Sequence, residues 1–212
     1  MGTLQRTLII IKKSILEILF PRNDKCITCG KDGIEGICNK CRNKIAYSYD
    51  EEEMSIGYYG GPLKQLILNL KCKGDFESGD VLVELAKERI KDISKDYYIT
   101  YIPISNNSLK IRGFNQCEYI AKELGFYCNL EVVNTLKRVK EVKTQKTLRK
   151  EERLENLKGA FAVIDKSLVT GKSFILIDDV ITTGATINEA IRVLKECNAK
   201  EIKILTLAKS HI

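Results

Sequence analysis

Histidine is nearly absent from this sequence, and so is any long uninterrupted apolar run. Among 212 residues there is one histidine, His211, which lies next to the C-terminus and is poorly placed to act as a catalytic base. The most apolar N-terminal stretch, Leu8 to Phe20, is interrupted by Lys12, Lys13 and Glu17. It is therefore too short and too charged to span a bilayer.

The N-terminal stretch is instead typical of an amphipathic helix, which we expect over residues 1–22 and packed on the body of the protein. Docking of this helix on a membrane surface is the alternative. No small-residue cleavage site follows it, so the sequence shows no export signal. We therefore expect no integral membrane segment.

Length and composition indicate a globular chain. A length of 212 residues suits one α/β domain plus a small attachment, and a hydrophobic content of 44% can build an ordinary core. The net charge of +7 favours polyanionic partners, which include nucleic acid, nucleotides and a membrane face.

The cysteines are unevenly distributed. Cys26-x-x-Cys29 and Cys38-x-x-Cys41 are separated by eight residues that include three glycines. Each pair brings two thiolates to one point, and the glycines let the hairpin fold back, so that all four can surround a tetrahedral Zn²⁺. A redox pair is the competing interpretation, but two pairs in so short a segment argue against it. We expect plain small apolar roles for the other cysteines, Cys72, Cys117, Cys128 and Cys197.

A structural zinc module is therefore predicted over residues 23–44. Clustered cysteines of this kind fit a metal site in a reducing compartment, so we expect a cytoplasmic protein.

The stretch from Ser173 to Ala208 has the pattern of a βαβ unit. Phe174 to Ile177 form an apolar run of strand length, and apolar residues recur at helical spacing over Ile187 to Cys197. Glu201 to Ala208 is strand-like again. A mainly parallel sheet is therefore expected, in a doubly wound α/β domain from about Ile45 to Ile212.

Polar residues fill the first turn of this unit. Asp178 and Asp179 follow the strand, and Thr182 to Thr186 precede the helix. Free N–H groups at a helix start, with small hydroxyl residues, make a nest for a phosphate group. Adjacent acids repel each other unless hydroxyls or a cation lie between them, which suggests a ribose diol or Mg²⁺ as their partner. The pattern predicts a sugar phosphate at the carboxyl ends of the strands.

Helix capping is the alternative interpretation of the same turn. Thr186 and Glu189 have the spacing of a capping box, and an aspartate at a strand end often only closes a turn.

Earlier in the chain, Tyr98 to Ile104 reads as a strand, followed by a loop over Ser105 to Gly113. Lys110 and Arg112 in this loop can hold a pyrophosphate, the arginine by forked hydrogen bonds and the lysine as a point charge. A solvated turn is the alternative, and it is the more common one for such a loop taken alone. Other elements expected from apolar patterning are a strand over Met54 to Tyr59, a helix from Leu63 that breaks over Lys71 to Asp75, a helix over Val81 to Ile90, and a helix over Gln116 to Leu124 closed by Gly125.

The turn after Ser173 resembles the phosphoribosyl-diphosphate (PRPP) binding motif of type I phosphoribosyltransferases, a hydrophobic strand followed by Asp-Asp-Val-x-Thr-Thr-Gly-x-Thr. The resemblance implies that Asp178 and Asp179 bind the ribose hydroxyls and that Thr182 to Thr186 bind the 5′-phosphate. It implies catalytic roles for Asp178, Asp179, Lys110 and Arg112. The full PRPP-binding set it implies is Ser105, Lys110, Arg112, Asp178, Asp179, Val180, Thr182, Thr183, Gly184, Ala185 and Thr186.

Two further strings narrow the resemblance. Ile102-Pro-Ile-Ser, followed by Arg112-Gly-Phe-Asn-Gln116, is similar to the ComF family of phosphoribosyltransferase-like proteins, of the ComFC type associated with natural competence. Other residues in that family's order are the paired cysteines, Tyr58-Tyr59, Lys71 with Gly74-Asp75, Gln145, Arg153, Asn156 and Gly159-Ala-Phe161.

Lys137 to Arg153 is the most basic segment of the chain. A charge run of this kind is usually a solvated face, and it can also follow a nucleic-acid backbone. In type I phosphoribosyltransferases the corresponding region is a loop that closes over the diphosphate, which implies lid roles for Lys143, Gln145, Arg149 and Arg153.

The resemblance implies a protein that binds PRPP with Mg²⁺ and handles incoming single-stranded DNA during natural transformation. If it is catalytic, it transfers the phosphoribosyl group to a nitrogen acceptor with loss of pyrophosphate. One alternative is a non-catalytic adaptor that senses PRPP and contacts single-stranded DNA or a helicase. Another is a nucleobase-salvage phosphoribosyltransferase.

Overall fold

In the computed structural model the described residues are 24–48, 50, 53–140 and 157–210, together with Thr7, Ile11, Ser14, Ile15 and Ile18. These five N-terminal residues are helical and exposed, with Ile18 at 79%. Within the described part of the chain, no helix is long and apolar enough to cross a membrane.

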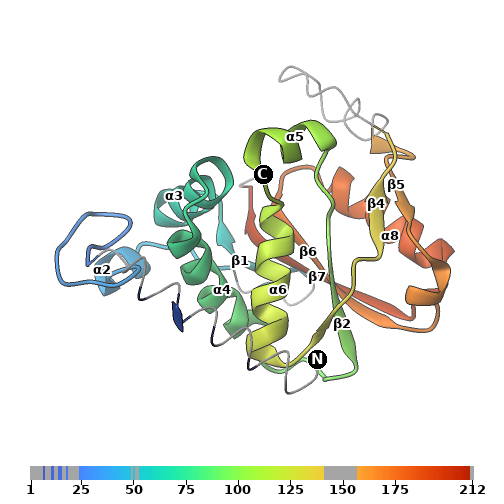
Figure 1. The fold of residues 1–212 in the computed structure, drawn as a ribbon, viewed down its shortest axis with the longest axis horizontal. Helices are drawn as coiled ribbons and strands as arrows, with labels where there is room; N and C mark the ends of the chain where they lie inside the picture. Colours follow the sequence, from blue (N-terminus) through green and yellow to red (C-terminus); the bar gives the residue numbers. More distant parts are fainter. Residues whose placement is uncertain are drawn as a thin grey trace.

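Five parallel strands form the central sheet, in the order β1-β7-β6-β2-β3 (Figure 1). The predicted parallel sheet is thereby confirmed, and all five strands end at a common edge. The strands are β1 (Glu53–Tyr58), β2 (Tyr97–Tyr101), β3 (Glu131–Val132), β6 (Ser173–Ile181) and β7 (Glu201–Lys209).

Strand β6 lies in the middle of the sheet because its apolar run is buried on both faces. Ile175 and Ile177 belong to the core shared with the helices of the N-terminal half, whereas Phe174 and Leu176 belong to the core under α8 (Ala185–Glu196). Covering layers on both faces explain why this strand is continuously apolar and does not alternate.

The helices of the N-terminal half are α3 (Gly61–Leu68), α4 (Phe76–Ile90), α5 (Asn106–Arg112) and α6 (Gln116–Cys128). Between α3 and α4 the chain continues through a π-helical turn, η1 (Asn69–Lys73), so the break expected from Lys71 starts only at Gly74, where φ is +66°. The described residues also include two short helical segments, α2 (Asn39–Arg42) and the 3₁₀ turn η2 (Lys166–Leu168).

Two predicted element boundaries are wrong. The segment Ser105 to Gly113 is not an open loop, because α5 occupies most of it, with the Ser105 hydroxyl accepting from the Ser108 amide at 3.1 Å. Helix α6 runs past Gly125 and ends at Asn129, whose φ is +54°. Gly125 serves close packing, since a Cβ there would lie 2.3 Å from a methyl group of Val132.

A separate antiparallel ribbon pairs β4 (Leu136–Arg138) with β5 (Phe161–Val163). Ala160 and Phe161 are buried in the core under α8.

The cysteine-rich segment packs on the outer side of α3 and α4 (Figure 1). The Gln65 amide of α3 donates to the Ile27 carbonyl at 3.3 Å, and the Arg42 guanidinium pairs with Glu84 of α4 at 2.9 Å. At Gly36 an added Cβ would lie 3.0 Å from a methyl group of Val81. The segment is thus joined to the same two helices that flank η1.

Candidate functional site

The threonine-rich turn lies at the carboxyl edge of the sheet, between β6 and α8. Gly184 is the residue before the helix, with φ of +72°, and no side chain caps the first turn. Thr182 is exposed, and Thr183, Gly184 and Thr186 are half-buried. The Ala185 amide makes a long hydrogen bond to the Thr183 hydroxyl at 3.4 Å. Because a helix start presents backbone N–H groups and the positive end of its dipole, this open turn suits a phosphate group.

The capping-box interpretation of this turn is wrong. Thr186 lies inside the helix, and the cap position is held by Gly184. Glu189 instead accepts from the Gly159 amide at 2.7 Å and pairs with Arg192 at 2.8 Å. It therefore ties α8 to the segment before β5 and leaves the helix start without a carboxylate.

The two aspartates at the end of β6 are buried, each 8% exposed. Asp179 Oδ2 accepts from Lys71 Nζ at 2.5 Å and from Gln116 Nε2 at 2.9 Å. Its Oδ1 accepts from the Val180 amide at 2.8 Å. Asp178 Oδ1 accepts from the Asp179 amide at 2.8 Å and lies 3.9 Å from the Cys117 thiol.

The two carboxyl groups differ in ionisation. Burial, and then the charge of Asp179, raises the pKa of Asp178 to about 8. Burial also acts on Asp179, but the Lys71 ammonium and hydrogen bonds from Lys71, Val180 and Gln116 lower the pKa of Asp179 below its ordinary value. The pair therefore holds a single negative charge near neutral pH, and Lys71 lies against it.

The other predicted site residues are only partly brought together. Arg112 Nη1 donates to Gln116 Oε1 at 3.0 Å, so Arg112 reaches Asp179 through that amide. Ser105 begins α5, and Lys110 is exposed on the same helix. In the described part of the chain, no contact joins Lys110 to either aspartate. The predicted lid residues, Lys143, Gln145, Arg149 and Arg153, lie outside the described residues. His211 also lies outside them.

Sequence reasoning missed three residues of this site. Lys71 and Gln116 were assigned to helix boundaries and to family strings but not to the site, and Cys117 was expected to be a plain small apolar residue. Cys117 is buried, and burial and the charges of both aspartates raise the pKa of its thiol well above the ordinary value. The available signal was positional, because Lys71 and Gln116 both lie in strings that carry the family resemblance.

The four paired cysteines converge as predicted. The Sγ atoms of Cys26, Cys29, Cys38 and Cys41 all lie within 4.8 Å of one another. Positive φ values at the hairpin glycines allow the fold-back, +72° at Gly30, +72° at Gly33 and +69° at Gly36.

The spacing of the sulfur atoms fits zinc. A tetrahedral Zn²⁺ with bonds of about 2.3 Å places its thiolates about 3.8 Å apart. Cys29 Sγ and Cys38 Sγ are 3.8 Å apart. Burial and the neighbouring thiols raise the pKa of Cys41 to about 12, so in the absence of a cation this thiol keeps its proton. The donor set is therefore complete and closed, as in structural zinc sites.

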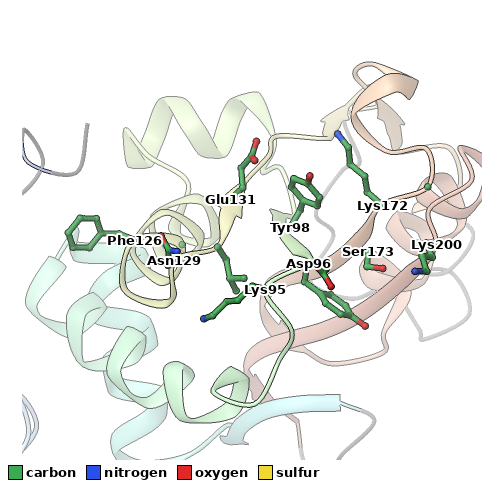
Figure 2. Close-up of a pocket in the computed structure, with 13 residues that line it drawn as sticks. Lys95, Asp96, Tyr98, Phe126, Asn129, Glu131, Lys172, Ser173 and Lys200 are labelled. Carbon is green, nitrogen blue, oxygen red and sulfur yellow. The ribbon is translucent and has the colours of Figure 1, made fainter. Parts of the chain in front are cut away.

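A hollow of about 640 Å³ lies at the opposite, amino edge of the sheet (Figure 2). Its walls include Lys95, Glu131 and Lys172, and Lys172 Nζ lies 5.0 Å from the centre of the Tyr98 ring. None of the predicted site residues that the structure describes lines it. The candidate site is thus separated from this hollow by the length of the strands.

The fold and a family comparison together define the class of protein to which the larger unit belongs. The family model of the phosphoribosyl transferase domain matches residues 110–212. Together with the parallel sheet covered on both faces, this match makes the larger unit a type I phosphoribosyltransferase-like domain.

Curated relatives narrow the class further. Competence protein ComFC of Streptococcus pneumoniae is 30% identical over 187 residues, which cover 88% of this chain and 81% of that protein. Competence protein F of Haemophilus influenzae is 28% identical over 194 residues, which cover 87% of this chain and 84% of that protein. DNA utilization protein YhgH of Escherichia coli is 26% identical and covers 89% and 86%. The chain belongs to the ComF family of competence proteins, which the sequence resemblance indicated.

Proposed function

We propose that this chain binds PRPP at the carboxyl edge of its sheet and acts in the uptake or handling of DNA. The observation that carries the PRPP proposal is the adjacency of an open helix start to two buried aspartates. A ligand that satisfies both features has a phosphate and a hydroxyl pair on one small framework, as a ribose 5-phosphate unit does.

In this proposal each part of the ligand has a partner. The 5′-phosphate lies on the amides and hydroxyls of Thr182 to Thr186. The ribose hydroxyls donate to Asp178 and Asp179, and the diphosphate extends toward Lys110 and Arg112.

Mg²⁺ fits the same place. Hard oxygen donors suit this ion, and it commonly binds through one or two carboxylates together with substrate phosphates. Both oxygens of Asp179 already accept hydrogen bonds, so Asp178 and Asp179 would hold Mg²⁺ together with the oxygens of the diphosphate and not by themselves. Bound there, it would neutralise charge on the departing diphosphate.

A role with DNA is supported by the relatives and by charge. Proteins named for competence and for DNA utilization match most of the chain. The net charge of +7 favours a polyanion as partner. We propose single-stranded DNA and a competence helicase as the partners, in the cytoplasm.

If the protein is catalytic, the reaction is transfer of the phosphoribosyl group from PRPP to a nitrogen acceptor, with pyrophosphate as the leaving group. Catalysis of this kind depends on charge stabilisation and positioning more than on a base. Arg112 and Lys110 supply the cations on the leaving-group side, while Asp178 and Asp179 orient the ribose.

The acid pair also favours a second candidate, a PRPP-sensing adaptor without turnover, because Asp179 is held by the protein's own Lys71 and Gln116. A salvage enzyme releases pyrophosphate with a nucleobase, and a phosphoribosyltransferase acting on another acceptor releases it with that acceptor. An adaptor binds PRPP and releases no pyrophosphate with any nucleobase or amine.

Three parts are proposed for the chain: an amphipathic helix over 1–22, a zinc module over 23–44 and the phosphoribosyltransferase-like domain over 45–212. Zinc in the module is supported by the 3.8 Å sulfur separation.

Isothermal calorimetry tests the proposed site directly. The wild-type protein should bind PRPP in the presence of Mg²⁺, whereas Asp178→Asn combined with Asp179→Asn should lose at least about 100-fold in affinity, because the pair loses its negative charge and one acceptor oxygen on each side chain. Circular dichroism should show the same fold in both proteins. An unchanged affinity in the double variant would remove the aspartates from the site.

A further inference from the structure

Lys71 lies at the rim of the acid pair, between the carboxylates and solvent. Its side chain remains 29% exposed, whereas that of Asp179 is 12% exposed. Lys71 comes from the π-helical turn η1, and such turns are frequent at functional sites. Lys71 is therefore a half-buried cation, more exposed to solvent than the carboxylate that it pairs with.

Two cations converge on this corner of the molecule. Gln116 donates to the same Asp179 oxygen as Lys71 and accepts from Arg112, so it bridges the two cationic side chains. Burial alone would lower the pKa of Lys71, but Asp179 outweighs burial and the Arg112 guanidinium and raises that pKa above its ordinary value. With Asp178 protonated near neutral pH, two cations face one carboxylate.

Asp179 Oδ2 is already saturated. A carboxylate oxygen offers two lone pairs, and those of Oδ2 accept from Lys71 and Gln116. A ribose hydroxyl that binds this oxygen must therefore replace one of the two donors. Gln116 is buried and held by Arg112, so the half-buried Lys71 is the donor better placed to leave.

This step rests on the proposed function. We propose that Lys71 is a ligand-binding residue, which transfers its ammonium from Asp179 to the diphosphate of PRPP when the ribose hydroxyls take its place on the carboxylate. In the empty site Lys71 pairs a buried charge that would otherwise be costly to leave alone. In the loaded site Lys71 and Arg112 bind the diphosphate from neighbouring positions, as a point charge and a fork.

The consequence is ligand discrimination. Ribose 5-phosphate has the same hydroxyl pair and 5′-phosphate as PRPP but no diphosphate, so it displaces Lys71 without offering the ammonium a new anion. Lys71 is thereby a determinant of the preference for PRPP over ribose 5-phosphate.

Affinities of Lys71→Met, Lys71→Arg and the wild type for PRPP and for ribose 5-phosphate test this. In Lys71→Met the affinity for PRPP should fall about 10- to 100-fold, the range of one charge-assisted hydrogen bond. The affinity for ribose 5-phosphate should stay within about twofold or improve, because its contacts do not include Lys71. Lys71→Arg should recover most of the preference. Lys73→Met is the matched control, since Lys73 is an exposed lysine of the same turn, and it should match the wild type for both ligands.

The outcomes separate the two proposals. Wild-type protein that binds neither ligand would contradict the proposed function itself. Wild-type protein that binds PRPP, with Lys71→Met losing affinity for both ligands by one common factor or for neither, would overturn the role of Lys71 and leave the site intact. Thermal unfolding of each variant checks that the losses do not come from a damaged fold.

Discussion

The four-cysteine cluster and the twin-aspartate site are both crowded groups of acids, and the protein neutralises them in different ways. Around the aspartates it provides Lys71, Gln116 and a retained proton. Around the thiols the recorded partners are other thiols and backbone amides, such as the Cys38 amide that donates to Cys26 Sγ at 3.3 Å. The charge of the first site is thus balanced by the protein's own groups, whereas the proposed zinc ion would balance the charge of the second.

The largest expected effect comes from removing one thiolate. Cys41→Ser should reduce zinc from one ion per chain to almost none and lower the free energy of unfolding by at least about 3 kcal/mol, because structural zinc sites bind with about 10–16 kcal/mol in small domains. Metal analysis by mass spectrometry and urea unfolding measure the two quantities. Cys72→Ser is the control, since Cys72 is exposed and outside the cluster. Wild-type protein purified without chelators that contains no zinc would contradict the assignment.

Within any one pH unit, a smaller effect should mark the proton that the acid pair retains. Because the folded pKa of Asp178 is about 8, above the ordinary value of 3.8, the folded state binds a proton that the unfolded state has lost between those pH values. Stability of the wild type should therefore fall as pH rises from about 4 to about 8, by at most about 1.4 kcal/mol per pH unit.

In Asp178→Asn this titration is removed. The stability difference between variant and wild type should shift in favour of the variant across the same pH window, as followed by urea unfolding at several pH values. Parallel stability profiles for the two proteins would mean that Asp178 is ionised in the folded state.

The smallest effect is expected at Cys117, the cysteine that contacts the aspartate pair and not the four-cysteine cluster. Cys117→Ala removes a buried thiol that contacts Asp178 and should cost roughly 1 kcal/mol of stability, as for a small apolar group. Zinc content should remain at one ion per chain. A loss of zinc in this variant, matching that of Cys41→Ser, would show that the two centres are not independent.

The sequence predicted best where one local cause decides the structure. Strand β6 was predictable because a strand covered on both faces is a continuous apolar run. The cysteine cluster was predictable because two closely spaced CxxC pairs are sufficient to bring four thiols together. Helix α5 could not be found in this way, because none of its residues is buried and apolar periodicity has nothing to detect. It depends on the Ser105 cap and on the left-handed Gly113, with φ of +78°.

The site could be predicted only in part, for a related reason. The threonine turn and the two aspartates are contiguous in the chain, so they can be identified as one sequence motif. Lys71 is 108 positions from Asp179, and Gln116 is 63 positions from it. Only the packing of η1 and α6 against the end of β6 brings these donors to the carboxylate.

The contacts of the cysteine module with α3 and α4 predict that the proposed sugar-phosphate site depends on zinc. Those two helices carry η1 between them, and the Gln65 and Glu84 contacts on either side connect the module to the turn that holds Lys71. A cell starved of zinc should then lose discrimination among sugar phosphates as well, although no sulfur atom touches the sugar.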